Sequence, residues 1–189
     1  MLDETRQHNQ FESISQVKNP EKGTPMNPIF ARTSVRQWTD EPVDDELILN
    51  ILKAGMQAPS ALNARPWSFV VITNPELKKQ LSEISPYSHF AANAPVLLAV
   101  LCHTDNACPP YNAIDMGICI ENMLLEITAQ NLGGVCLGVA PLKERMEMMA
   151  KLLKLRAGID PYALIALGHP AGPAKVQDRF DPQRIEWIR

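Results

Sequence analysis

Apolar residues recur along this chain with two different periods, which predict strands and helices in mixed order. Runs rich in β-branched, aromatic and other apolar residues predict strands over 68–73, 95–103, 135–140 and 162–168. Apolar residues three or four positions apart predict helices over 44–58, 74–84, 112–132 and 141–155. No repeat or low-complexity tract interrupts the mixture. The pattern therefore predicts an α/β or α+β fold and does not choose between the two.

Capping residues and glycines set the expected boundaries of these elements. Asp44 is suited to cap the first helix. Asn74 followed by Pro75 supplies a cap and a first helical residue for the second helix. We expect Gly133 and Gly134 to end the third helix. Because these glycines lead from a helix into a strand, they do not form the turn of a dinucleotide-binding motif, which leads from a strand into a helix.

The helix predicted over 112–132 is apolar on almost every side. Ile114 and Ile118 lie on one side of it, and Met116 and Ile120 lie on another. In a chain of this size, so long a helix is buried on all faces most easily by a second subunit. The pattern therefore favours a homodimer.

The length of the chain limits the number of domains, and its charge limits the partners that we expect. At about 150 residues per domain, 189 residues predict one domain. Residues 1–26 are polar and predict an N-terminal arm or tail, and residues 27–189 predict the single domain. The formal net charge of −3 provides no general basic surface for a nucleic-acid backbone. We therefore expect no nucleic-acid partner.

The sequence also supports expectations about the location of the protein and about metal binding. Its apolar stretches fall short of the ~20 residues of a membrane span, and its first residues lack the features of a secretory signal. We expect a cytoplasmic protein without membrane association, in which the four cysteines, none in a C-x-x-C pair, are free thiols. Cys102, His103 and Cys108 match no zinc-ligand spacing, so no metal site is expected.

Arg32, Ser34 and Arg36 form the first group with candidate chemistry. Because they alternate, an extended backbone would point all three side chains the same way. Two guanidinium groups and a hydroxyl suit a phosphate, since arginine offers forked donors that match phosphate oxygens. The alternative is a solvated charged segment. The G-x-S-x-G, P-loop and H-E-x-x-H motifs are absent, which weakens a simple hydrolase interpretation.

The second group lies in a loop framed by Pro59 and Pro66, between a helix and a strand. Ser60, Asn63 and Arg65 are held in this stiff loop. Amide and hydroxyl groups on a rigid loop supply both donors and acceptors and can recognise the edge of a heterocycle. The alternative is an ordinary surface turn.

Five ordered motifs over residues 28–187 resemble the FMN-dependent nitroreductase family. ARTSVRQW is similar to its R-x-S-x-R-x-[FW] start, and APSALNARPWSF is similar to its A-P-S-x-x-N-x-[QR]-P-W-x-F segment. The helix from Asp115 to Leu125, the strand LGGVCLGV and the last strand YALIALGHP follow in the family's order. The chain departs from the family at Ala61, where a second serine is common, and at Arg65 and Glu121, where glutamine is common.

The resemblance implies an α+β fold and a set of site residues. It implies a nitroreductase-like α/β sandwich with a central, mostly antiparallel sheet flanked by helices, in a homodimer with FMN sites at the interface. The implied FMN contacts near the phosphate and ribityl chain are Arg32, Thr33, Ser34, Arg36 and Arg179. Those implied beside the flavin ring are Leu137 and Gly138, near its N5, and Pro59, Ser60, Ala61, Asn63 and Arg65 from the partner subunit.

The resemblance also implies the reaction. Hydride passes from NADH or NADPH through FMN to a nitroaromatic, a quinone or a similar small-molecule acceptor. The flavin carries the chemistry, so no catalytic side chain is predicted. Arg65 is a candidate for stabilising the reduced flavin, with an interface salt bridge as the alternative. Other tasks stay open: dehydrogenation, reductive dehalogenation, flavin breakdown, or flavin binding without catalysis.

Overall fold

The computed structural model describes residues 27–173 and 175–188, so the predicted arm over 1–26 lies outside the described residues. The helices are α2 (Pro28–Ala31), α3 (Asp45–Met56), α4 (Pro75–Ser82), α5 (Asn112–Ala129) and α6 (Lys143–Leu153). The strands are β1 (Trp67–Ile72), β2 (Val96–His103), β3 (Gly133–Gly138) and β4 (Ile159–Gly168). Short 3-10 turns are η1 (Ala61–Asn63), η2 (His89–Asn93), η3 (Pro109–Tyr111) and η4 (Pro182–Arg184).

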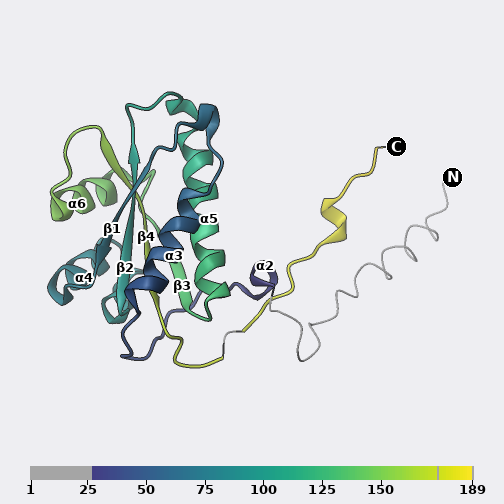
Figure 1. Cartoon of the computed structure of the whole chain (residues 1–189), viewed down its shortest axis with the longest axis horizontal. Helices are drawn as coiled ribbons and strands as arrows, with labels where there is room; N and C mark the ends of the chain where they lie inside the picture. Colours follow the sequence, from purple (N-terminus) through teal and green to yellow (C-terminus); the bar gives the residue numbers. More distant parts are fainter. Residues whose placement is uncertain (1–26, 174, 189) are drawn as a thin grey trace.

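The four strands form one sheet in the order β1-β2-β4-β3, and each neighbouring pair is antiparallel. A parallel bridge between Ser34 and Gly134 extends the sheet at the β3 edge. The sheet lies between α3 and α5 on one side and α4 and α6 on the other (Figure 1). The predicted α+β sandwich with a mostly antiparallel sheet is therefore confirmed.

The central strand β2 shows how the pattern of the sequence builds two cores. Its first seven residues are all buried. Val96, Leu98 and Val100 pack with α3 and α5, whereas Leu97 and Ala99 pack with α4 and α6. Alternate side chains of a strand point to opposite faces, so a strand covered on both faces reads as a continuous apolar run. The prediction of such a strand over 95–103 is confirmed.

The helix starts follow the capping signals in part. The side chain of Asn74 accepts a hydrogen bond of 2.9 Å from Leu77 N, and Pro75 opens α4 as predicted. Asp44 occupies the cap position of α3, but its side chain makes no capping hydrogen bond. The short helix α2, capped by Asn27, was not expected from the pattern.

The prediction that Gly133 and Gly134 end the long helix is wrong. Helix α5 ends at Ala129, the chain turns at Asn131 with φ of 58°, and both glycines begin β3. The glycines are needed for packing instead of for a helix stop. A Cβ atom at Gly133 would lie 2.7 Å from a methyl carbon of Val35, closer than atoms pack.

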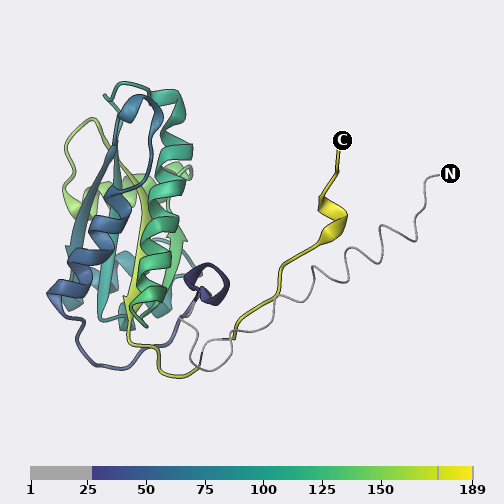
Figure 2. The same ribbon diagram turned by 45° about the vertical axis from the view of Figure 1, so that its right-hand side comes forward.

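Part of α5 is exposed in the single chain. Ile114, Gly117 and Glu121 lie on one face of the helix and are exposed, while Met116 and Met123 are fully buried. The C-terminal segment from residue 175 runs away from the sheet and its helices (Figure 1, Figure 2). In the part of the chain that the structure describes, no helix is both long and apolar enough to cross a membrane.

Candidate functional site

Segment 33–38 is fastened to the edge strand β3 by backbone contacts. Val35 N donates to Gly134 O over 3.1 Å, and the indole N–H of Trp38 donates to Gly133 O over 2.7 Å. The absence of a side chain at Gly133 lets Val35 lie directly against β3. These contacts hold the backbone of the segment against β3.

Segment 33–38 and the start of the C-terminal segment enclose a polar hollow of about 540 Å³. Among the described residues, three cationic side chains line it, those of Arg36, Lys175 and Arg179, and no carboxylate does. The remaining lining residues are Thr33, Ser34, Val35, Gln37, Gly172, Pro173 and Gln177. The structure thus brings together four of the predicted phosphate-side residues, Thr33, Ser34, Arg36 and Arg179.

Arg32 does not line the polar hollow. Its Nε lies 3.5 Å from a carboxylate oxygen of Glu121 on α5. The expectation that Arg32, Ser34 and Arg36 point the same way therefore does not hold in this structure. The carboxylate of Glu121 competes for the guanidinium, and the local alternation of residues 32–36 contains no information about that distant residue.

A second, aromatic hollow of about 210 Å³ lies at the end of β3. It is lined by Arg36, Ile84, Ser85, Tyr87, Ser88, Phe90, Val135, Cys136, Leu137, Gly138 and Arg145. The guanidinium carbon of Arg36 lies 5.8 Å from the ring centroid of Phe90, a cation–π contact. Arg36 lines both hollows, so the two meet at this side chain. The predicted ring-side residues Leu137 and Gly138 lie in the aromatic hollow.

The cysteine in this hollow is a neutral thiol at neutral pH. Burial, with a smaller contribution from the Glu121 charge, raises the pKa of Cys136 to about 11. Burial also raises the pKa of Cys102 to about 11 and that of Cys119 to about 12. Since the thiolate is the reactive form, none of the three is a nucleophile at neutral pH. Among the described residues, no three His, Cys, Asp or Glu side chains converge as a metal ion would require.

The predicted ring-side loop over 59–65 lines neither hollow. Ser60 Oγ accepts from Arg65 N over 2.9 Å, which closes the loop on itself. Ala61 N donates to both oxygens of Asp115, at 3.1 and 3.2 Å. Asn63 and Arg65 have φ of 53° and 46° and are exposed, as is Pro59. The loop therefore presents polar side chains outward from a fixed base.

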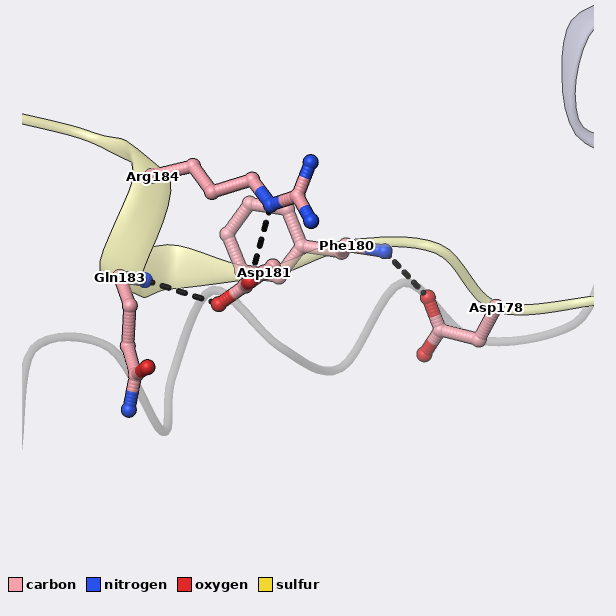
Figure 3. Close-up of polar contacts among 5 residues, drawn as sticks. All are labelled: Asp178, Phe180, Asp181, Gln183 and Arg184. Carbon is pink, nitrogen blue, oxygen red and sulfur yellow. Dashed lines mark hydrogen bonds and ion pairs between the residues drawn. The ribbon is translucent and has the colours of Figure 1, made fainter.

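The C-terminal segment that carries Arg179 is ordered by contacts within itself. Arg179 donates to the side chain of Gln177 over 3.0 Å. Asp178 accepts from Phe180 N, and Asp181 accepts from Gln183 N and pairs with Arg184 (Figure 3). These contacts form short local turns over residues 177–184.

The structure adds residues that the sequence did not point to. Lys175 joins the polar hollow and Arg145 joins the aromatic hollow. Asp115 is not among the predicted site residues, yet it is 2% exposed and accepts hydrogen bonds from Ala61 N in loop 59–65. A carboxylate in an otherwise apolar stretch of helix was the available signal, because a buried charge requires partners.

Comparisons with known proteins agree with this geometry. The chain matches the profile of the Nitroreductase family over residues 29–86 and 85–169. It is 37% identical over 158 residues to a protein of Methanothermobacter thermautotrophicus named as an NADH dehydrogenase/NAD(P)H nitroreductase, covering 83% of each chain.

Two solved structures carry the comparison to three dimensions. An NADH oxidase from Clostridium acetobutylicum superposes with a TM-score of 0.82 at 34% identity, covering 86% of this chain and 99% of that one. A nitroreductase from Desulfovibrio desulfuricans in complex with FMN superposes with a TM-score of 0.75 at 31% identity, covering 92% of this chain and 99% of that one.

Proposed function

The chain belongs to the nitroreductase family, and from this premise we propose that it binds FMN and uses NADH or NADPH to reduce a small organic acceptor. The FMN complex of the relative from Desulfovibrio desulfuricans supports the choice of cofactor. The observation that carries the proposal is the pair of hollows that meet at Arg36. One hollow is cationic and the other is aromatic.

The two hollows fit the two ends of FMN. A phosphate carries close to two negative charges and needs cationic or N–H and O–H donors when it leaves water. Arg36, Lys175 and Arg179, with the hydroxyls of Thr33 and Ser34, form such a donor set in the polar hollow. The aromatic hollow, with Phe90 and Leu137, provides apolar surface for a planar ring.

The residues that line the aromatic hollow would bind and orient the ring and would not themselves react. Bound FMN would supply the transfer of two electrons as hydride, from the nicotinamide to the acceptor. Gly138 has nothing within 4 Å of the place where a Cβ would stand, so a ring can approach the strand end closely there. The neutral thiol of Cys136 leaves this wall uncharged.

The acceptor class we propose is a quinone or a nitroaromatic compound. A quinone takes up the hydride and one proton from water and becomes the hydroquinone. A nitro group takes up the hydride and one proton, loses water and becomes a nitroso group. Both reactions consume one NAD(P)H and leave NAD(P)⁺, and neither requires an acid–base pair of side chains.

We further propose that the protein works as a homodimer with FMN at the interface. Exposed apolar side chains cluster around the open face of α5: Ile29 and Phe30 of the adjacent α2, and Ile114 of α5 itself. More lie on the C-terminal segment, such as Ile188, which is 92% exposed. Apolar surface of this extent on a single chain favours a partner. A second copy would also bring its loop 59–65, with Ser60 and Asn63, toward the FMN.

An absorption and titration experiment on the full-length protein tests the proposed function. We expect flavin bands near ~450 and ~370 nm, which bleach when NADH or NADPH is added without oxygen. Removal of the flavin and titration with FMN and riboflavin should show much tighter binding of FMN, since only FMN carries the phosphate. Protein that takes up no FMN would overturn the proposal. A flavin that neither nucleotide bleaches would leave flavin binding without this catalysis.

Sedimentation of the same samples tests the assembly. We expect a dimer that holds one FMN for each chain. A flavin-loaded monomer would contradict the interface site and would reassign loop 59–65 to an ordinary surface turn.

A further inference from the structure

The aromatic hollow carries a positive charge to which the proposed function assigns no role. Within the part of the chain that the structure describes, two guanidinium groups line it, those of Arg36 and Arg145, and no carboxylate does. Arg36 also lines the polar hollow, where the proposed function assigns it to the phosphate. Arg145 lines only the aromatic hollow, and the proposed function gives it no part in holding the phosphate.

Arg145 is held in place by a neutral group. Its Nη1 donates to Gly138 O over 3.0 Å, at the end of β3. This bond fixes the guanidinium but leaves its charge uncompensated. Arg145 forms no ion pair with any carboxylate of residues 27–173 and 175–188. Its side chain is half-buried on the first turn of α6, so a ligand in the hollow can reach it.

The two serine side chains of this hollow make hydrogen bonds within their own segment. Ser88 Oγ lies 2.8 Å from Ser82 O and 2.9 Å from Ser85 O, so its hydrogen is used within the segment. Ser85 Oγ accepts from Tyr87 N over 3.2 Å. The walls that remain are apolar or aromatic, with Arg145 as their uncommitted cation. Such a lining suits a flat ring, and its cation suits a negative group held against that ring.

We propose that Arg145 makes this site selective for electron acceptors that carry a negative charge, with aromatic carboxylates as the chemical class. This inference rests on the proposed function, because an acceptor must contact the flavin ring to receive hydride. With the ring in this hollow, an acceptor would stack on the open face of the ring, and Arg145 on the wall of the hollow would lie beside both. The contact with the carboxylate would be a forked, charge-assisted hydrogen bond, for which arginine is well suited.

Paired acceptors that differ in one charge test the proposal. We would measure kcat/KM for 4-nitrobenzoate and for nitrobenzene with the FMN-loaded protein, and repeat both with Arg145→Gln. The ratio of the two values should fall about fivefold, the loss expected for one partly exposed charge contact. Arg145→Lys should restore part of the ratio. Arg156→Gln is the matched control, since Arg156 is exposed and lines neither hollow.

A binding measurement gives a second readout that does not depend on turnover. Benzoate and benzamide have nearly the same shape and differ in charge. Titration of the FMN-loaded protein, followed by flavin absorbance and by calorimetry, should show tighter binding of benzoate. Arg145→Gln should weaken benzoate about fivefold and leave benzamide unchanged, because only the charged ligand uses the guanidinium.

Each contrary result has its own signature. An unchanged acceptor ratio and unchanged benzoate affinity in Arg145→Gln would overturn the inference while wild-type turnover upholds the proposed function. A higher KM for NADH or NADPH with an unchanged acceptor ratio would assign the cation to a nucleotide phosphate and equally overturn it. If the wild-type protein binds no FMN, the proposed function is wrong, and this inference, which rests on it, is wrong as well.

Discussion

Segment 33–38 and loop 59–65 both carry candidate cofactor contacts, but they are held in different ways. The first is fastened to β3 along its length, by a backbone bridge, the indole of Trp38 and the close packing of Val35 on Gly133. The second rests on one carboxylate, Asp115, and turns outward.

The difference indicates which half of the site one chain completes. Segment 33–38 already encloses the polar hollow with the C-terminal segment of the same chain. Loop 59–65 contains three residues other than glycine with positive φ, and Leu62 among them is 78% exposed. Strained backbone persists only where the surrounding structure holds it in place, and such positions are concentrated at functional sites. We infer that the phosphate end of the site is built within a chain and that the ring end is completed between chains.

The largest effect is expected where the fastened segment is forced off β3. In Gly133→Val, three carbon atoms would enter the space of Val35, at a cost of about 3 kcal/mol. Thermal unfolding should show a lower Tm, and FMN binding should weaken in the same variant. Gly138→Ala is the control for stability, because its Cβ would meet nothing within 4 Å. An unchanged Tm would mean that the contact with Val35 does not hold the segment.

Removing the guanidinium of Arg36, which lines both hollows, should weaken FMN binding without unfolding the protein. Arg36→Ala should reduce FMN affinity about tenfold to a hundredfold, since hydrogen bonds between charged groups are the strong ones. Riboflavin affinity should change much less, because riboflavin lacks the phosphate. Fluorescence titration with both flavins measures this difference. Equal losses for the two would move Arg36 from the phosphate to the ring.

Releasing the outward loop should affect assembly more than the fold. Asp115→Ala leaves Ala61 N without its acceptor, at a cost of about 1–3 kcal/mol. We expect weaker dimerisation, measured by sedimentation at several concentrations. We also expect faster loss of FMN, measured by flavin fluorescence. Asp115→Asn retains one acceptor oxygen and should lie between this variant and the wild type. If Asp115→Ala dimerises and holds FMN normally, the two regions are less different than their contacts indicate.

The smallest effect is expected at Glu121, which pairs with Arg32. This pair is partly exposed, with 21% and 54% of the two side chains accessible, so its contribution is small. Glu121→Gln frees Arg32 and removes a negative charge, and should strengthen FMN binding about twofold to fivefold. The gain should disappear in an Arg32→Ala background. A gain that persists there would exclude Arg32 as the residue through which Glu121 acts.

The local sequence pattern predicted most of the fold and a smaller part of the candidate site. The buried strand β2 and the cap at Asn74 were predicted because burial and capping leave their signal in adjacent residues. The role of Gly133 was misjudged because a glycine after a helix has two uses, and only the position of Val35 decides between them.

The site depends on contacts between residues far apart in the chain. Arg32 meets Glu121 and Ala61 meets Asp115 only after the helices have packed. The spacing of Arg32, Ser34 and Arg36 predicted a common direction, and the tertiary contact of Arg32 changed it. Arg145 gave no signal, since an arginine on the first turn of a helix is usually a surface residue.

The position of Arg36 between the two hollows constrains how this protein can change over generations. A substitution there alters the hold on the cofactor and the surroundings of the acceptor at once, so a gain in one is tied to a loss in the other. Arg179 and Arg145 each line a single hollow, and each can vary with fewer side effects. Libraries built to find new acceptors should therefore diversify Arg145 and keep Arg36 constant, and natural variants with altered acceptors are expected to differ at the former.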